Sequence, residues 1–432
     1  MTAKLFAKGL QSHRSGDWAG AEQAYRRVLR KTPKHLDANY MLGTLYAEQG
    51  NLMAALPHLQ YAAELDPRSP YIRNNLGNVH LLLGKLDDAE SCFRQALARN
   101  PELAEAHNNL GNIHKRRGET EAALDCYQAA ISAKPDFIDA AVNLSGTLLD
   151  AGQPEAALPL LTQVVNMAPG NALAHEALGT AQMKLGLKDE AIQHLRRSLE
   201  LGAHPHSEAA LKLARLGEGE IPESYPANAL RRTYEQKAAT WDRDVERSED
   251  QFFGPTHIQA TVDKLLPGKT GLTILDIGCG TGACAPFLRP LASKLDGVDL
   301  SPHMLEQAAA KKLYDHLTCT DMLALLHETA GSYDLISASG VMILLGNLEA
   351  PLKAVAHALK PGGLFVFTVY DNDIEDLSVR ENLHFAHSRQ HIEEKTEIAR
   401  LKTISIDSMV HEIANGMPQP GLIIALQKPA KD

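Results

Sequence analysis

Hydrophobic positions follow two different patterns in the two halves of this 432-residue chain. Up to about residue 205, small and large apolar residues return every 34 residues within segments of helical spacing. From about residue 229, short apolar runs alternate with helical patterns instead. A fixed period of this length predicts stacked pairs of helices, whereas strand–helix alternation predicts a parallel sheet covered by helices. The chain is therefore expected to contain two architectures in series.

The repeat is defined by small residues, one large residue and a proline at fixed positions. Small residues allow two antiparallel helices to pack closely, and proline ends the second helix because it has no N–H to donate. The recurring positions are Ala21, Ala55, Ala89, Ala123, Ala157 and Ala191; Gly9, Gly43, Gly77, Gly111 and Gly179, with Ser145 substituting once; Pro33, Pro67, Pro101, Pro135 and Pro169; and Tyr25, Leu59, Phe93, Tyr127, Leu161 and Leu195. This pattern resembles the tetratricopeptide repeat (TPR). It predicts an α-solenoid of six repeats over residues 1–205.

Asparagines recur on the first helix of successive repeats, at Asn75, Asn109 and Asn143. The resemblance places these helices along the concave groove of the solenoid. An amide can donate to and accept from a peptide backbone, and the series resembles the asparagine ladder of protein O-GlcNAc transferases. These residues are therefore candidates for binding a protein or peptide partner. The alternative is that they form hydrogen bonds between repeats.

Composition sets limits on partners and compartment. The formal net charge of −10 argues against a nucleic-acid partner held mainly by phosphate contacts. The apolar runs are too short to span a membrane, and the first residues do not resemble a signal peptide. Five cysteines without metal-ligand spacing predict a reducing, cytoplasmic compartment and no metal site. Residues 206–228 are predicted to form a capping helix and a linker, and residues 229–432 a second domain.

In the second domain, strands are expected near 272–277, 295–299, 316–319, 333–338 and 363–369. The tail is expected to add two antiparallel strands, 401–413 and 421–427, which makes seven in all. The first strand runs into Asp276-Ile277-Gly278-Cys279-Gly280-Thr281-Gly282, and a helix is expected from Phe287, Leu288 and Leu291. Glycines at such a turn allow a ligand to approach backbone N–H groups closely.

Three acids follow three successive strands and indicate which ligand the turn holds. Asp276 would repel a pyrophosphate but suits a ligand with positive charge. Asp299, some 17 residues past Gly282, is at about the spacing at which an acid binds both ribose hydroxyls of an adenosine. Asp321 could accept a hydrogen bond from an adenine amino group. Together they predict S-adenosylmethionine as the cofactor.

The second domain resembles the class I methyltransferases, and the whole chain resembles methyltransferases that carry tetratricopeptide repeats. The segments that carry this resemblance include 234–242, 300–305, 311–315, 385–388 and 419–422. It implies a Rossmann-like seven-stranded α/β domain after the solenoid, with an S-adenosylmethionine site formed by Asp276, Gly278, Cys279, Gly280, Gly282, Asp299, Leu300, Asp321, Met322 and Ser339. Tyr234, Lys237 and Trp241 would close over that site, or else be ordinary packing residues. One departure is that the segment 339–344 lacks the acidic and aromatic residues usual near the fourth strand.

The methyl acceptor is expected over the carboxyl ends of the fourth and fifth strands, where Ser339 lies. Candidates for a catalytic role there are Tyr370, Asp371, His384 and His387. The interpretation we favour is a methyltransferase whose repeats recruit a protein or peptide, which is either the substrate or a localising partner. The alternatives are a methyltransferase for a quinone-like or lipid-precursor small molecule, with the repeats used for assembly, and a scaffold whose second domain has no activity.

Overall fold

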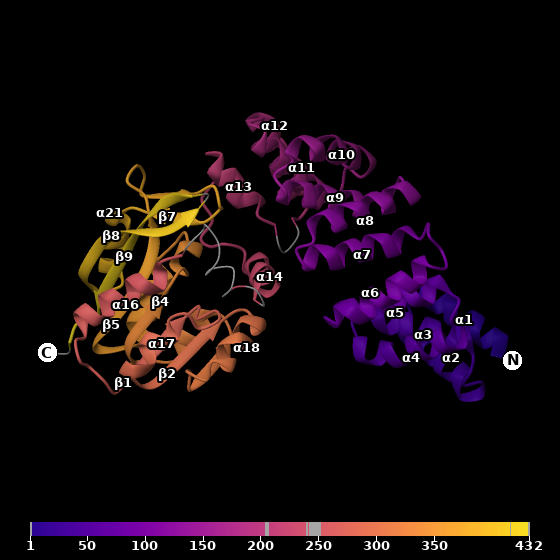
Figure 1. Ribbon diagram of the computed structural model, residues 1–432, viewed down its shortest axis with the longest axis horizontal. Helices are drawn as coiled ribbons and strands as arrows, with labels where there is room; N and C mark the ends of the chain where they lie inside the picture. The colour runs from indigo at the N-terminus through magenta and orange to yellow at the C-terminus, as the bar shows by residue number, and fades with distance from the viewer. Residues whose placement is uncertain (1, 204–206, 239–240, 242–251, 415, 431–432) are drawn as a thin grey trace. The chain divides into compact units, whose positions relative to one another are not determined.

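A computed structural model describes residues 2–203, 207–238, 241, 252–414 and 416–430, and Figure 1 shows its elements. The chain divides into two compact units, Met1–Leu187 and Lys188–Asp432. This division falls inside the sixth repeat, so the second helix of that repeat belongs to the C-terminal unit. The boundary that the repeat pattern places at residue 205 stays a prediction.

The N-terminal unit consists of consecutive antiparallel helix pairs (Figure 1). Each pair from α1/α2 to α9/α10 begins with a helix that carries the recurring glycine or serine and ends before a recurring proline, which confirms the predicted helical repeat. The helices are α1 (Thr2–Arg14), α2 (Trp18–Lys31), α3 (Leu36–Glu48), α4 (Leu52–Leu65), α5 (Pro70–Leu82), α6 (Leu86–Leu97), α7 (Ala104–Arg116), α8 (Thr120–Ala133), α9 (Ile138–Asp150), α10 (Pro154–Met167) and α11 (Ala172–Lys184). The next helix, α12 (Lys188–Glu200), belongs to the C-terminal unit.

The recurring positions require glycine because a large side chain of the partner helix fills the space where a Cβ atom would lie. A Cβ atom added at Gly77 would lie 2.6 Å from the ring of Phe93, and one at Gly111 would lie 2.6 Å from the ring of Tyr127. Both rings are completely buried. The glycine and the large residue are therefore one packing unit, which is why they recur with the same period.

Substitution of Gly111 by alanine is expected to lower the free energy of unfolding by about 1–3 kcal/mol, because Tyr127 has no space to retreat into. Gly146 is a matched control, since an added Cβ there meets only Lys115 Nζ, at 3.9 Å. Alanine at Gly146 is expected to be neutral or to stabilise the helix by up to about 1 kcal/mol. Urea unfolding followed by circular dichroism measures both, and equal effects would contradict the packing argument.

The C-terminal unit consists of one mixed sheet covered by helices on both faces (Figure 1). Its strands are β1 (Leu272–Ile277), β2 (Ala292–Asp299), β3 (His316–Cys319), β4 (Tyr333–Ala338), β5 (Leu359–Asp371), β6 (Leu377–Val379), β7 (Phe385–His387), β8 (Lys402–Ala414) and β9 (Met417–Gln427). Its helices after α12 are α13 (Ala209–Arg215), α14 (Ala227–Lys237), α16 (Gly254–Leu265), α17 (Ala285–Leu288), α18 (Pro302–Ala310), α19 (Met322–Glu328), α20 (Glu349–Ala358) and α21 (Arg389–Ile398), with short 3-10 turns η1 (Arg289–Leu291) and η2 (Met342–Leu344).

The strand order confirms the expected sheet and adds to it. The parallel strands run β3-β2-β1-β4-β5, β9 pairs antiparallel with β5, and β8 pairs antiparallel with β9. These are the seven strands expected from the sequence. Two further short strands, β7 and β6, extend the sheet from the carboxyl end of β5. The order reverses between β1 and β4, and ligands of open α/β sheets bind at such a point.

Both faces of the sheet are buried, which explains the uninterrupted apolar runs of its central strands. In β1, Leu275 and Ile277 belong to the core that includes Val355 of α20, whereas Ile274 belongs to the core that includes Ile258 of α16. The expected helix after the glycine turn is short, because α17 spans only four residues before η1. The turn therefore presents backbone N–H groups without a long helix behind it.

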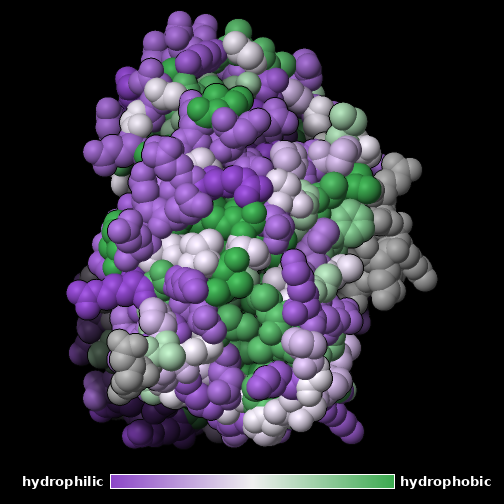
Figure 2. Space-filling view, turned by 90° about the vertical axis from the view of Figure 1, so that its left-hand side faces the viewer, coloured by the Kyte–Doolittle hydropathy of each residue, from purple (hydrophilic) through white to green (hydrophobic). Residues whose placement is uncertain are grey.

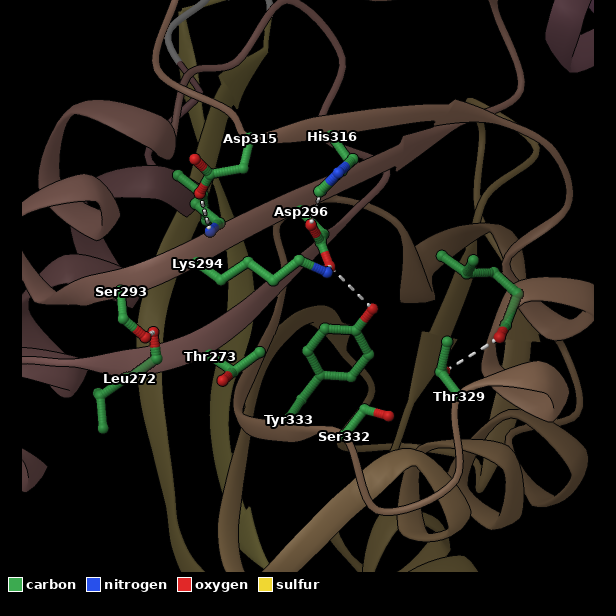
Figure 3. Close-up of polar contacts among 12 residues, drawn as sticks. Leu272, Thr273, Ser293, Lys294, Asp296, Asp315, His316, Thr329, Ser332 and Tyr333 are labelled. Atoms are coloured by element: carbon green, nitrogen blue, oxygen red, sulfur yellow. Dashed lines mark hydrogen bonds and ion pairs between the residues drawn. The ribbon is translucent and has the colours of Figure 1, made fainter.

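Asp296, in the middle of β2, is an acidic residue with structural partners. Asp296 of β2 is 7% exposed; its carboxylate accepts from Lys294 Nζ at 2.7 Å and from the Tyr333 hydroxyl at 3.2 Å, and it lies 3.0 Å from His316 Nδ1 (Figure 3). These contacts tie β2 to the beginnings of β3 and β4. This acid is therefore structural, in contrast to the acids at the carboxyl ends.

On one face of the C-terminal unit, hydrophobic side chains gather in a band bordered by hydrophilic ones (Figure 2). Large apolar residues exposed in this unit include Ile374 and Met417. Within the described ranges, every helix is too short or too polar to traverse a bilayer.

Candidate functional site

A cavity of about 860 Å³ lies at the carboxyl ends of the central strands, within the C-terminal unit. All ten residues that the sequence analysis assigned to the cofactor line it: Asp276, Gly278, Cys279, Gly280, Gly282, Asp299, Leu300, Asp321, Met322 and Ser339. Pockets that hold one ligand typically measure about 300–1,000 Å³. This cavity is at the large end of that range, so it has space for a nucleoside and a small second molecule.

The glycine turn forms one wall of the cavity in a conformation that side chains oppose. Gly278, Gly280 and Gly282 have φ angles of 59°, 53° and 88°. A Cβ atom at Gly278 would lie 2.2 Å from Val341 Cγ2. The turn thus needs glycine both for its backbone conformation and for the close approach of the loop after β4.

Asp299 at the end of β2 is held by the turn that it faces. One carboxylate oxygen accepts from Gly280 N at 2.9 Å and the other from Ser301 N at 2.8 Å. Burial raises the pKa of Asp299, while these backbone hydrogen bonds oppose the rise. The carboxylate therefore has a fixed orientation at the cavity wall, as a group that binds a pair of hydroxyls requires.

Asp276 at the end of β1 is almost completely buried and has two hydroxyl donors. It accepts from the Tyr314 hydroxyl at 2.7 Å and from Ser337 Oγ at 2.9 Å. Burial raises its pKa to about 6, and these two hydrogen bonds only partly oppose the rise. A carboxylate in such surroundings gains strongly from a cationic ligand, and the ammonium group of S-adenosylmethionine supplies that charge.

The raised pKa of Asp276 predicts how stability and cofactor affinity depend on pH. The folded state holds the proton up to a pKa of about 6, above the ordinary aspartate value of 3.8, so the ligand-free protein loses stability as the pH rises through this window. Affinity for S-adenosylmethionine should change in the opposite direction and fall by about threefold to tenfold between pH 7 and 5.5, because a protonated carboxyl group does not attract the ammonium. Calorimetric titration across this range measures it. Asp276→Asn should bind weakly and without this dependence; an unchanged profile in that variant would contradict the assignment.

Asp321 lies at the start of α19 and combines two roles. Its Oδ1 accepts from Leu323 N at 2.8 Å and so caps the helix, and the residue also lines the cavity. Met322 and Leu300 add apolar lining beside it. A flat base could therefore lie between apolar side chains and meet a polar edge at Asp321.

The three residues expected to close over the site are only partly described. Tyr234 of α14 and Trp241 line the cavity, with their ring centroids 5.4 Å apart in an edge-on arrangement. Burial, with the nearby carboxylates of Asp299 and Glu412, raises the pKa of Tyr234 to about 12. The side chain of Lys237 lies outside the described part of the chain. Closure over a ligand stays a prediction.

The structure separates the four residues considered for a catalytic role. Tyr370 and His384 line the cavity, whereas Asp371 and His387 are not among the lining residues. His387 is buried behind η2, and burial lowers its pKa to about 3. The geometry therefore favours Tyr370 and His384 as neighbours of a methyl acceptor.

Lining residues of this part of the cavity that were not identified from the sequence include Phe252, His411 and Glu412. The hydroxyl of Tyr370 donates to Glu412 Oε1 at 2.5 Å. Phe252 occupies the space beside Gly340, since a Cβ atom there would meet its ring at 2.9 Å. The segment 339–344 after the fourth strand has no aromatic residue, and the aromatic ring of Phe252, from another part of the chain, fills the space there. The sequence signal that could have identified His411 is a histidine within the alternating pattern of the expected strand 401–413.

In the N-terminal unit, the recurring asparagines make hydrogen bonds between repeats. Asn109 Nδ2 donates to Asn78 Oδ1 at 2.7 Å, and Asn143 Nδ2 donates to Asn108 Oδ1 at 2.9 Å. Asn75 donates across to the preceding repeat as well. The amides therefore join neighbouring repeats, as the alternative interpretation expected, and contact with a partner chain stays a prediction.

Comparison with protein families covers both units. A family model described as "Methyltransferase domain" matches residues 251–401. Two models described as "Tetratricopeptide repeat" match residues 13–70 and 74–136, and residues 46–96 and 148–216. The matches include the cofactor residues of the cavity and most of the helical pairs, whereas His411 and Glu412 lie outside the matched ranges.

Curated relatives of this chain include several methyltransferases. Methyltransferase-like protein 27 of Homo sapiens is 36% identical over 155 residues, which are 35% of this chain and 61% of the relative. Malonyl-[acyl-carrier protein] O-methyltransferase of Salmonella typhimurium is 29% identical over 30% of this chain and 52% of its own length. Ubiquinone biosynthesis O-methyltransferase of Xanthomonas axonopodis pv. citri is 28% identical over 30% of this chain and 55% of its own length. The chain thus spans about half to three fifths of these relatives.

Proposed function

We propose that this chain, which joins tetratricopeptide repeats to a methyltransferase domain of the class I fold, transfers a methyl group from S-adenosylmethionine to an oxygen atom. The observation that carries the proposal is the pairing of a side-chain-free turn at Gly278 with the carboxylates of Asp276 and Asp299 at the wall of one cavity. A buried acid with a raised pKa favours a cationic ligand, and a fixed acid favours a pair of hydroxyls. One nucleoside, S-adenosylmethionine, carries both features.

Each of the three carboxylates at the cavity wall is proposed to bind a different part of this cofactor. Asp276 would hold the ammonium of the amino-acid end, Asp299 the ribose hydroxyls, and Asp321 the adenine edge. Its sulfonium provides an activated methyl group and a neutral leaving group, so the protein needs neither an oxyanion hole nor an acid for the leaving group. What remains for the chain is to align the acceptor, exclude water and receive a proton.

The choice of oxygen as the methylated atom is supported by the names of relatives. Two of the three relatives described above are named O-methyltransferases, one acting in ubiquinone biosynthesis and one on a malonyl group on acyl-carrier protein. Among the described lining residues around Tyr370 there is no lysine, and the Glu412 carboxylate there would favour the protonated, unreactive form of an amine, so these surroundings suit a hydroxyl better.

We assign to the repeats the recruitment of a protein or peptide partner, which presents the acceptor or localises the enzyme. Tetratricopeptide repeats commonly bind proteins, and their first helices line the groove of the solenoid. The five cysteines are all free, which suits the reducing cytoplasm as the site of action. The second candidate function keeps the enzyme but uses the repeats for assembly, with a small molecule as the acceptor; the named ubiquinone relatives favour it.

Label transfer from methyl-labelled S-adenosylmethionine into a cell lysate tests the proposal and separates the candidates. The full chain is added to lysate that is then divided into protein and low-mass fractions. Label in protein supports a recruited substrate, and label in small molecules supports the second candidate. Absence of label in both, while calorimetry shows cofactor binding, would leave only a scaffold without activity and would end the proposal.

A further inference from the structure

A β-bulge places His411 in the cavity. In the pairing of β8 with β9, Val410 lies opposite Pro420 and Glu412 opposite Gln419, so His411 is an extra residue in β8. Neighbouring residues of a regular strand point to opposite faces, whereas a bulge turns a side chain out of that alternation. His411 and Glu412 both line the cavity as a result.

The surroundings of His411 are built to hold an imidazole ring. A Cβ atom at Gly421, on the facing strand, would lie 2.7 Å from His411 Cβ, so glycine there leaves the necessary space. The ring packs between Tyr370 and Phe252, with centroid distances of 4.4 Å and 5.2 Å. His411 has no exposed surface. Nothing in this packing requires nitrogen atoms, because a phenyl ring would pack equally well.

Neither ring nitrogen of His411 has a hydrogen-bond partner among the residues that the structure describes. Buried polar groups are nearly always paired, and an exception calls for an explanation. Since this ring lines a cavity beside the proposed cofactor site, the simplest explanation is a hydrogen-bonding group of a bound molecule.

The charged and titratable groups around His411 keep it neutral. Burial, together with the nearby side chains of His384, Arg380 and His257, lowers its pKa to about 3. Arg380 lies over the Tyr370 ring, 4.6 Å from its centroid. On the other side, Glu412 is engaged by the Tyr370 hydroxyl. A neutral imidazole can accept a proton or a hydrogen bond at any pH near 7.

We propose that His411 is the catalytic residue that receives the proton of a neutral hydroxyl on a small apolar acceptor, a phenol or an enol, bound beside Tyr370 and Phe252. This inference rests on the proposed methyl transfer and adds the acceptor class and the base. The apolar lining from Leu344, Leu345 and Ile413 suits the carbon framework of such an acceptor.

Atoms and charge balance in this step. The acceptor oxygen forms a bond to the methyl carbon, the carbon–sulfur bond breaks with its electron pair left on sulfur, and the hydroxyl proton moves to a ring nitrogen of His411. One positive charge disappears at sulfur as one appears on imidazole. The net charge of the cavity therefore stays constant during the step. The free-energy cost of protonating the buried histidine is lowered because the positive charge of the sulfonium disappears as the proton arrives.

A carboxylate acceptor fits this end of the cavity poorly. Glu412 is an acid, and the arginine and lysine found among the described lining residues, Arg231 and Lys311, come from α14 and the end of α18, which pack together beside the cofactor residues. Arg380 lies over the Tyr370 ring but is not among the lining residues, and its guanidinium donates to Gln419. A carboxylate bound at His411 would face Glu412 and would need no base. A neutral hydroxyl avoids the repulsion and uses the histidine.

Calorimetric binding tests the acceptor class, with hexylresorcinol as the neutral phenol and decanoate as the carboxylate. The full chain saturated with S-adenosylhomocysteine should bind hexylresorcinol at least about tenfold more tightly than decanoate. His411→Phe, which keeps the ring packing, should lose this preference and still bind sinefungin normally. Equal binding of the two probes, tighter binding of decanoate, or no binding of either would overturn the acceptor class. Failure of the unaltered protein to bind sinefungin would instead overturn the proposed function.

Methyl transfer to hexylresorcinol tests the base. The rate should vary little between about pH 6 and 8 for the unaltered protein and should fall at least about hundredfold in His411→Gln at pH 7. The residual rate of that variant should rise about tenfold per pH unit, because only the ionised phenol then reacts. His391→Phe, at a half-buried histidine in α21 away from the cavity, controls for the loss of an imidazole and should keep the rate and its pH profile. A His411→Gln rate within threefold of the unaltered rate, or with the same flat profile, would show that His411 only packs.

Discussion

Substitution of Gly278 by alanine is expected to weaken binding of S-adenosylmethionine by about a hundredfold, which corresponds to about 2.7 kcal/mol. The added Cβ would lie 2.2 Å from Val341 Cγ2, and the φ angle of 59° is one that alanine adopts only with strain. Because Val341 is β-branched and stiff, the turn must move, and its backbone N–H groups move with it. Isothermal titration calorimetry with S-adenosylmethionine measures the loss.

Two further variants separate steric displacement from backbone strain. Gly331 has nearly the same φ angle, 57°, but a Cβ there meets no atom within 4 Å. Gly331→Ala should cost some stability and leave cofactor affinity within twofold. Removal of the clash in Gly278→Ala/Val341→Ala should recover part of the affinity. If Gly331→Ala weakened binding as much as Gly278→Ala, the close-approach argument would fail.

Substitution of Asp299 by alanine is expected to weaken binding of the same cofactor by about tenfold to fiftyfold. The change removes the proposed contacts to both ribose hydroxyls and also releases Gly280 N and Ser301 N, which the carboxylate now fixes. Calorimetry on the full chain gives the change in affinity, and a melting curve in the absence of ligand gives the change in stability.

Asp296, three residues earlier on β2, is the matched control for Asp299. Its carboxylate contacts Lys294, His316 and Tyr333 rather than the cavity (Figure 3). Asp296→Asn should lower the free energy of unfolding by about 1–3 kcal/mol and leave cofactor affinity unchanged. Similar losses of affinity in both variants would mean that Asp299 acts only by supporting the strand.

Local patterns were sufficient to predict most of the fold. The repeat glycines and the large residues that fill their space are set by contacts between two adjacent helices, so their period is visible in the chain. The central strands are buried on both faces and therefore appear as continuous apolar runs, as in β1. The length of α17 could not be predicted in this way, because Pro290 and the early start of β2 end it through contacts that are not periodic.

The candidate site could be predicted where its residues follow strands directly, and not where they come from distant segments. Asp276, Asp299 and Asp321 lie at or just beyond the carboxyl ends of β1, β2 and β3, so the topology brings them together. His411 comes from the other end of the domain, and only the bulge in β8 and the space beside Gly421 turn it toward the cavity. In the same way, β6 and β7 depend on pairing with the end of β5, which their three-residue lengths do not signal.

A crystal structure of the full chain with sinefungin tests the central claim most directly. The account predicts the ligand in the cavity at the carboxyl ends of β1 and β2, with its amino-acid end near Asp276 and both ribose hydroxyls on Asp299. A ligand bound elsewhere, or this cavity filled by side chains at saturating sinefungin, would contradict the account.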